Sequence, residues 1–152
     1  MIEERIKELG LDLPAAPKAV GSYQPCVRSG NMLYVSGQLP MKDGQLLAKG
    51  PVGEACTPEE AKQAARQCVM NILAVAKQAA VSLDNVYRIV QLQGMVHTTF
   101  ADASNCVPTM NAASDLLFEI FGDKGLHSRA AVGVAALPLG AAVEVLAIIE
   151  LA

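Results

Sequence analysis

Two helical patterns, each followed directly by a β-prone run, constrain the fold of this chain more than any other feature. In the first, Thr57 can cap a helix that continues to about residue 80, Pro58 suits its first position and Glu60 completes a capping box. Small and aliphatic residues then recur every three or four positions, which predicts a helix that packs closely on a sheet. These positions are Ala61, Ala65, Cys68, Ile72, Val75, Ala76 and Ala79.

The second helix is predicted over residues 107–122. Pro108 lies near its start and Gly122 is suited to end it. The apolar side chains expected in the core are Leu116, Leu117, Ile120 and Phe121. A further short helix is predicted at residues 1–11, where acidic residues precede basic ones.

The remaining segments favour strands. Residues 26–40 are typical of a hairpin that turns at Ser29-Gly30-Asn31, with a bulge or a close backbone approach at Gly37. Residues 86–96 predict a central strand with a glycine bulge at Gly94. Two final strands, 129–136 and 142–151, are expected to pair as a hairpin about a turn at 137–140.

This order of elements indicates a single α+β domain over residues 1–152, with one mixed sheet covered on one face by two helices. A chain of this length can bury a core without disulfides or metals. The small residues of the Arg129, Ala131, Gly133 and Ala135 face are expected on the uncovered side of the sheet, packed against another subunit.

Composition narrows the possible partners. Apolar residues make up 52% of the chain and charged residues 18%, so a partner subunit is expected to cover part of the surface. The net charge is −3 with no run of Lys or Arg, which argues against binding a nucleic acid or an anionic membrane surface. No apolar run is long enough to span a membrane. The widely spaced Cys26, Cys56, Cys68 and Cys106 are expected to be reduced thiols in a cytoplasmic protein.

Arg129 and Glu144 are isolated charges within apolar, strand-like runs. In one interpretation Arg129 is a solvated strand end and Glu144 protects an edge strand from aggregation, and periodicity alone favours this. In the other, Arg129 binds a carboxylate through its planar guanidinium, and Glu144 orients water as an acid or base. The expected hairpin register places Glu144 opposite residues 132–134, so the two charges need not touch within one chain.

The segments "VGSYQPCVRSGNMLYVSGQLP" (20–40) and "HSRAAVGVAALPLGAAVEVLAI" (127–148) together resemble the RidA/YjgF family of imine deaminases. The resemblance spans nearly the whole chain from about residue 19, as a divergent and slightly longer branch. It implies a chorismate-mutase-like fold and a homotrimer, in which the sheets form a central barrel with the helices outside. The sites would lie in clefts between subunits.

The resemblance also implies a reaction. In active members an arginine at the start of a strand binds the carboxylate of a 2-imino or 2-enamino acid, and water adds to the C=N carbon to give a 2-oxo acid and ammonia. No metal or organic cofactor takes part. The matching catalytic residues are Arg129 and Glu144. Expected to line the cleft and bind substrate are Tyr23, Ser36, Gly37 and Gln38, together with His127, which lies near Arg129.

Two alternatives remain open. One is a noncatalytic trimer that keeps Arg129 to recognise small carboxylates, and the other is an endoribonuclease or translation inhibitor, which the acidic charge disfavours. Ala131 stands where some members carry a cysteine, so thiol-linked reactivity is not expected. A structural role is favoured for His97, and a capping or interface role for Asn111 and Asp115.

Overall fold

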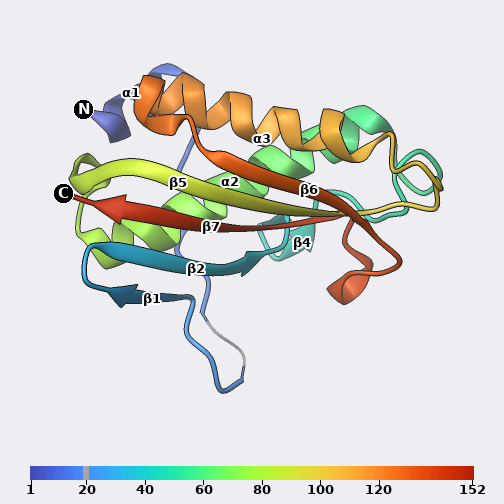
Figure 1. Ribbon diagram of the computed structural model, residues 1–152, viewed down its shortest axis with the longest axis horizontal. Helices are drawn as coiled ribbons and strands as arrows, with labels where there is room; N and C mark the ends of the chain where they lie inside the picture. Colours follow the sequence, from blue (N-terminus) through green and yellow to red (C-terminus); the bar gives the residue numbers. More distant parts are fainter. Residues whose placement is uncertain (19–20) are drawn as a thin grey trace.

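The computed structural model describes residues 1–18 and 21–152. Five strands form a mixed sheet in the order β1-β2-β7-β5-β6, and two long helices, α2 and α3, cover one of its faces (Figure 1). The α+β architecture predicted from the sequence is therefore confirmed. The strands are β1 (Cys26–Ser29), β2 (Met32–Gln38), β5 (Val86–His97), β6 (Ser128–Val134) and β7 (Val143–Leu151). The helices are α2 (Pro58–Ala80) and α3 (Cys106–Phe121).

Smaller elements surround this sheet. Strands β3 (Met41–Lys42) and β4 (Gln45–Leu46) form a separate hairpin, and three short 3₁₀ helices span Leu83–Asn85, Gly122–Gly125 and Pro138–Gly140. The predicted N-terminal helix is present as α1 (Ile2–Glu8), and the Arg5 Nε atom donates a hydrogen bond of 3.0 Å to the Glu119 carbonyl at the end of α3. Within the described residues, no helix has the length and apolarity needed to cross a bilayer.

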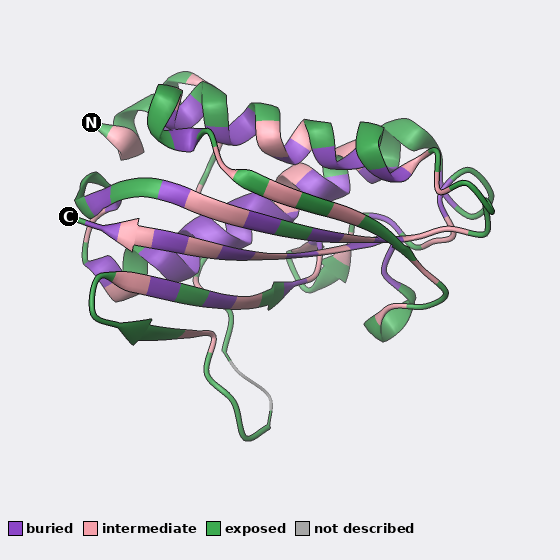
Figure 2. Cartoon of the chain, in the orientation of Figure 1, coloured by how far each residue is buried: buried purple, intermediate pink, exposed green. Residues whose placement is uncertain are grey.

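Helix α2 begins as its sequence predicts. The Glu60 amide donates to the Thr57 hydroxyl and the Thr57 amide donates to the Glu60 carboxylate, both at 3.1 Å, which completes the capping box. The predicted stripe is buried against the sheet apart from the half-buried Ala79, and its alanines let the helix lie close to the strands (Figure 2).

The predicted hairpin between the last two strands is wrong. Strand β6 pairs in parallel with β5, while β7 lies between β2 and β5 and is antiparallel to both. Helix α3 connects β5 to β6 as a crossover, and such a connection returns the chain to a parallel neighbour. Glu144 consequently lies on a central strand, opposite Met95 rather than residues 132–134, so the edge-strand interpretation of Glu144 is also wrong.

The expected uncovered face of β6 is reversed. Arg129 and Gly133 lie opposite Leu92 and Val96, which are buried beneath the helices. A Cβ atom on Gly133 would lie 2.7 Å from Thr98 Cγ2, so the small residue there accommodates the covering segment rather than a second subunit. Ala135 follows the end of β6. The uncovered face instead carries Ser128, Ala130, Val132 and Val134 from β6, next to Met95, Leu146, Ile148 and Tyr34 from the other strands.

The two strand glycines differ in their roles. At Gly37 the pairing of β2 with β7 shifts register between Val35 and Gln38, so the predicted bulge is confirmed. At Gly94 the pairing is regular, and the predicted bulge is wrong. Gly94 is instead a point of close approach, because an added Cβ would overlap the Met110 side chain of α3.

Candidate functional site

The first part of the candidate site is the Glu144 carboxyl group on the uncovered face of the sheet. Its Oε1 atom lies so close to the Gly37 backbone that an added Cβ at Gly37 would overlap it. The side chain is half-buried, and desolvation raises the pKa of Glu144 above the ordinary carboxyl value. A raised pKa brings the protonation equilibrium of this carboxyl group closer to neutral pH, as acid–base catalysis requires.

Ser36 and Gln38 hold the bulge that presents Gly37 to Glu144. The Ser36 hydroxyl donates a hydrogen bond of 2.6 Å to the Gln24 carbonyl, which ties the segment before β1 to β2. The buried Gln38 side chain donates to the Ser36 carbonyl at 3.1 Å. In this chain both side chains therefore support the backbone around Glu144.

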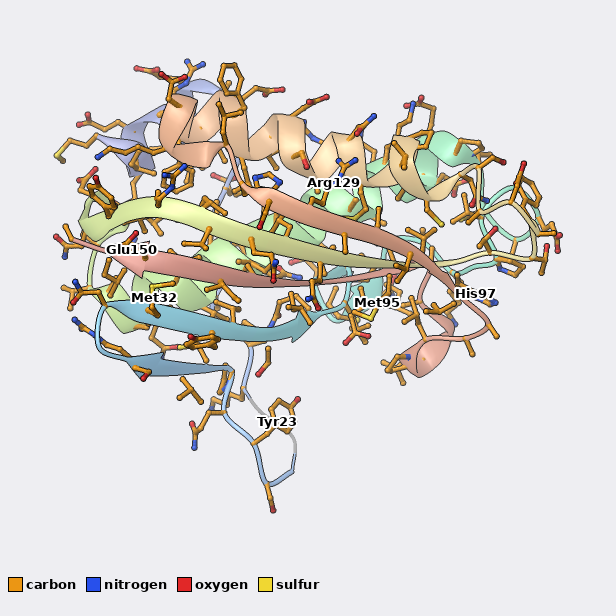
Figure 3. The ribbon with its side chains drawn as sticks, in the orientation of Figure 1. Tyr23, Met32, Met95, His97, Arg129 and Glu150 are labelled. Atoms are coloured by element: carbon orange, nitrogen blue, oxygen red, sulfur yellow. The ribbon has the colours of Figure 1, made fainter. Side chains whose placement is uncertain are left out.

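Tyr23, Gly37 and Gln38 line one open cavity of about 970 Å³. Its other walls come from the segment after α1, from β3 and from α2, where the buried Asn71 side chain donates to the Leu39 and Met41 carbonyls at 3.0 Å each. Tyr23 is 54% exposed and projects from the loop that leads into β1 (Figure 3). The structure thus gathers three of the predicted binding residues around one space.

The second part of the candidate site surrounds Arg129 on the helix-covered side of the sheet (Figure 3). Its Nη1 atom donates to Asn111 Oδ1 at 2.9 Å and to Ser114 Oγ at 3.1 Å. The His127 ring contacts the same serine through Nε2 at 2.9 Å and the Gly125 carbonyl through Nδ1 at 2.7 Å. Arg129 and His127 are therefore joined by Ser114.

The sequence does not single out Ser114, and it predicts a capping or interface role for Asn111. A signal was available, since the two residues are three positions apart and so share one face of α3. That face packs on β6, where Arg129 lies. Polar residues at this spacing indicate a polar partner on the neighbouring element, which here is the half-buried Arg129.

The two parts of the site do not meet within one chain. Arg129 projects toward α3, whereas Glu144 projects from the opposite face of the sheet, and β5 separates their strands. Tyr23 lies beyond β2, at the far side of the sheet from β6 (Figure 3). One chain therefore carries two separate clusters of candidate residues, one around Glu144 and one around Arg129.

Other candidate residues have simpler surroundings. His97 packs against Gly50, where an added Cβ would lie 2.7 Å from Nδ1, and this buried nitrogen has no hydrogen-bond partner among the described residues. Burial raises the pKa of all four thiols, that of Cys68 most strongly, which disfavours reactive thiolates. Among residues 1–18 and 21–152, no group of three or more His, Cys, Asp or Glu side chains is arranged to hold a metal ion.

Similarity to known proteins extends along the chain. A family model described as "YjgF/chorismate mutase-like, putative endoribonuclease" matches residues 3–151. Protein TCP17 of Trypanosoma cruzi is 40% identical over 153 residues, which cover 99% of this chain and 94% of that protein. The crystal structure of Atu1372 from Agrobacterium tumefaciens, a protein with unknown function, has 42% identity and a TM-score of 0.90, and covers 99% of this chain and 92% of its own. A 2-iminobutanoate/2-iminopropanoate deaminase of Capra hircus is 36% identical over 135 residues, 88% of this chain and 82% of that protein.

Proposed function

Because this chain belongs to the YjgF/RidA family, we propose that it hydrolyses reactive 2-imino and 2-enamino acids to 2-oxo acids and ammonia. Relatives that are 28–36% identical carry the name 2-iminobutanoate/2-iminopropanoate deaminase. The observation that carries the proposal is Glu144, a half-buried carboxyl group with a raised pKa that lies against Gly37 on an open sheet face. A carboxyl group in such a place is suited to exchange protons with water.

In the proposed reaction Arg129 binds the substrate carboxylate through two parallel N–H···O bonds. Glu144 accepts a proton from a water molecule while the water oxygen bonds to the C=N carbon. The π electrons of that bond move to nitrogen, which takes up the proton from Glu144. The hydroxyl proton of the resulting carbinolamine then passes to the amino nitrogen through Glu144, and the C–N bond breaks to release ammonia as the C=O bond forms. One imine and one water thereby give one 2-oxo acid and one ammonia.

We propose further that the Glu144 cluster and the Arg129 cluster are two half-sites, which meet between protomers of a homotrimer. The half-site around Arg129 lies at one edge of the sheet, and Tyr23 and Gly37 lie toward the other. A cyclic assembly brings one edge of a protomer beside the opposite edge of the next, so each cleft would combine Arg129 of one chain with Glu144 of its neighbour. The uncovered apolar sheet face supplies surface for such contacts. The reaction is proposed to be cytoplasmic, where the four free thiols would stay reduced.

The experiment is a deaminase assay in which an amino acid oxidase generates 2-iminobutanoate or 2-iminopropanoate in situ and 2-oxo acid is followed. The wild type should accelerate its release, and Arg129→Ala should lower kcat/KM about a hundredfold. Glu144→Gln should lower kcat by about a hundredfold or more. Arg66→Ala and Glu150→Gln are the matched controls, since Arg66 lies on α2 and Glu150 on the same strand and face as Glu144.

Each competing function predicts a different result. A noncatalytic trimer would bind a 2-oxo acid but leave the rate of imine hydrolysis at its uncatalysed value. An endoribonuclease would cleave RNA and would leave the rate of imine hydrolysis at its uncatalysed value. Catalysis that is unchanged in Arg129→Ala would remove the arginine from the mechanism.

A further inference from the structure

The hydrogen bonds of Arg129 leave one edge of its guanidinium free. The group has five N–H donors, two of them on Nη1. Both Nη1 hydrogens are used, because Asn111 Oδ1 and Ser114 Oγ each accept one, at 2.9 and 3.1 Å. Among the described residues, Nε and Nη2 make no hydrogen bond. They form the side of the guanidinium that matches a carboxylate with two parallel bonds.

The bonds around Ser114 also fix where the protons of His127 lie. The Gly125 carbonyl can only accept, so the His127 Nδ1 atom, 2.7 Å away, must carry a proton. Ser114 Oγ accepts from Arg129 and has one hydrogen of its own to donate. Its 2.9 Å partner is His127 Nε2, and an Nε2 atom without a hydrogen would accept that bond.

We propose that His127 and Ser114 are positioning residues that, with Asn111, orient Arg129 so that its Nε/Nη2 edge receives the substrate carboxylate. The Gly125 carbonyl fixes the ring of His127, and the ring fixes the hydroxyl of Ser114. That hydroxyl and the Asn111 side chain then hold Nη1. This inference rests on the proposed function, because it specifies how the arginine of that site binds its ligand.

The arrangement gives His127 an indirect role. Both of its ring nitrogens are occupied, one by Ser114 and the other by Gly125. A ligand could contact either nitrogen only after one of these bonds had broken. His127 therefore acts through Ser114 and Arg129 rather than by binding the substrate.

The first test is the tautomer of His127, which does not depend on any activity. Long-range ¹H–¹⁵N correlation spectra of the full-length protein at neutral pH should show His127 protonated at Nδ1 and unprotonated at Nε2. The chain has two histidines, so a His97→Gln variant assigns the signals. An Nε2–H tautomer, or a ring that exchanges between both forms, would overturn the proposed order of hydrogen bonds.

The second test is a comparison of binding and turnover in Ser114→Ala and Ser114→Thr. Loss of one hydrogen bond to the charged guanidinium should raise KM for the imino acid, and Kd for 2-oxobutanoate, about tenfold. The kcat value should change less than about threefold, because Glu144 is untouched. Ser114→Thr keeps the hydroxyl and should recover most of the affinity. Asp115→Ala, on the next and exposed position of α3, is the matched control.

Failure of this inference differs from failure of the proposed function. If the wild type deaminates imino acids but Ser114→Ala keeps its KM and Kd, the positioning role is wrong while the function stands. If kcat falls and KM does not change, Ser114 acts on the chemical step and the positioning role is again wrong. If the wild type neither binds 2-oxobutanoate nor hydrolyses imines, both proposals fail. Thermal unfolding of each variant separates these outcomes from misfolding.

Discussion

Arg129 and Glu144 project from opposite faces of one sheet, with strand β5 between the strands that carry them. The arginine is held by α3, and the glutamate lies against Gly37 on the face that no helix covers. Two residues placed in this way cannot act together on one small molecule within a single chain. If they share a substrate, they do so between neighbouring chains.

The contact between Gly37 and Glu144 predicts a separable effect on activity. In Gly37→Ala the new methyl group would displace the Glu144 carboxylate, which is the free end of a flexible side chain. The backbone at Gly37 is not in the left-handed region, so the free energy of unfolding should change by less than about 1 kcal/mol. Deaminase kcat should fall at least about tenfold. Wild-type kcat in a variant that folds normally would show that the contact is unimportant.

The raised pKa of Glu144 predicts how stability depends on pH. Because desolvation favours the protonated form in the folded state, the carboxyl group contributes stability below its ordinary pKa, about 4.3, and that contribution is lost as pH rises through the folded-state pKa. Glu144→Gln cannot ionise, so its midpoint of thermal unfolding should exceed that of the wild type increasingly as pH rises. Glu150→Gln is the control. If the difference in unfolding midpoint between Glu144→Gln and the wild type shrinks as pH rises, the pKa of Glu144 is not raised in the folded protein.

The packing of Gly94 against α3 predicts a loss of stability on enlargement. Gly94→Ala places a methyl group into the space of the Met110 side chain, and both residues are buried. Overpacking of this kind should lower the free energy of unfolding by about 1–3 kcal/mol in urea titrations. Met110→Ala would make room, so the double variant should lose less than the sum of the two single changes. Additive losses would mean that the two side chains do not compete for space.

Local signals predicted the local structure of this chain. The Thr57–Glu60 capping box, the Gly122 stop and the turn at Gly30-Asn31 depend on residues a few positions apart, and each is present. The predicted pairing of the last two strands is wrong because strands that are adjacent in sequence favour a hairpin, and the prediction relied on that adjacency. The crossover through α3 instead takes β6 to the far side of β5.

The candidate site was predictable only in part for the same reason. The motifs identified Arg129, Glu144 and Gly37 as residues, but not which face of the sheet each occupies, since a strand's faces are set by its partners. The bond from Arg129 to Ser114 depends on how α3 docks against β6. Neither segment alone contains that information.

The most direct test of a shared site uses two inactive variants. Arg129→Ala and Glu144→Gln should each keep only about a hundredth of the activity or less alone, and they should be mixed by co-expression or by unfolding and refolding together. If each site takes Arg129 from one chain and Glu144 from its neighbour, random mixing restores about a quarter of the sites. We predict that deaminase activity returns to about that fraction of the wild-type value. Mixed oligomers that are verified by native mass spectrometry and remain inactive would contradict the account.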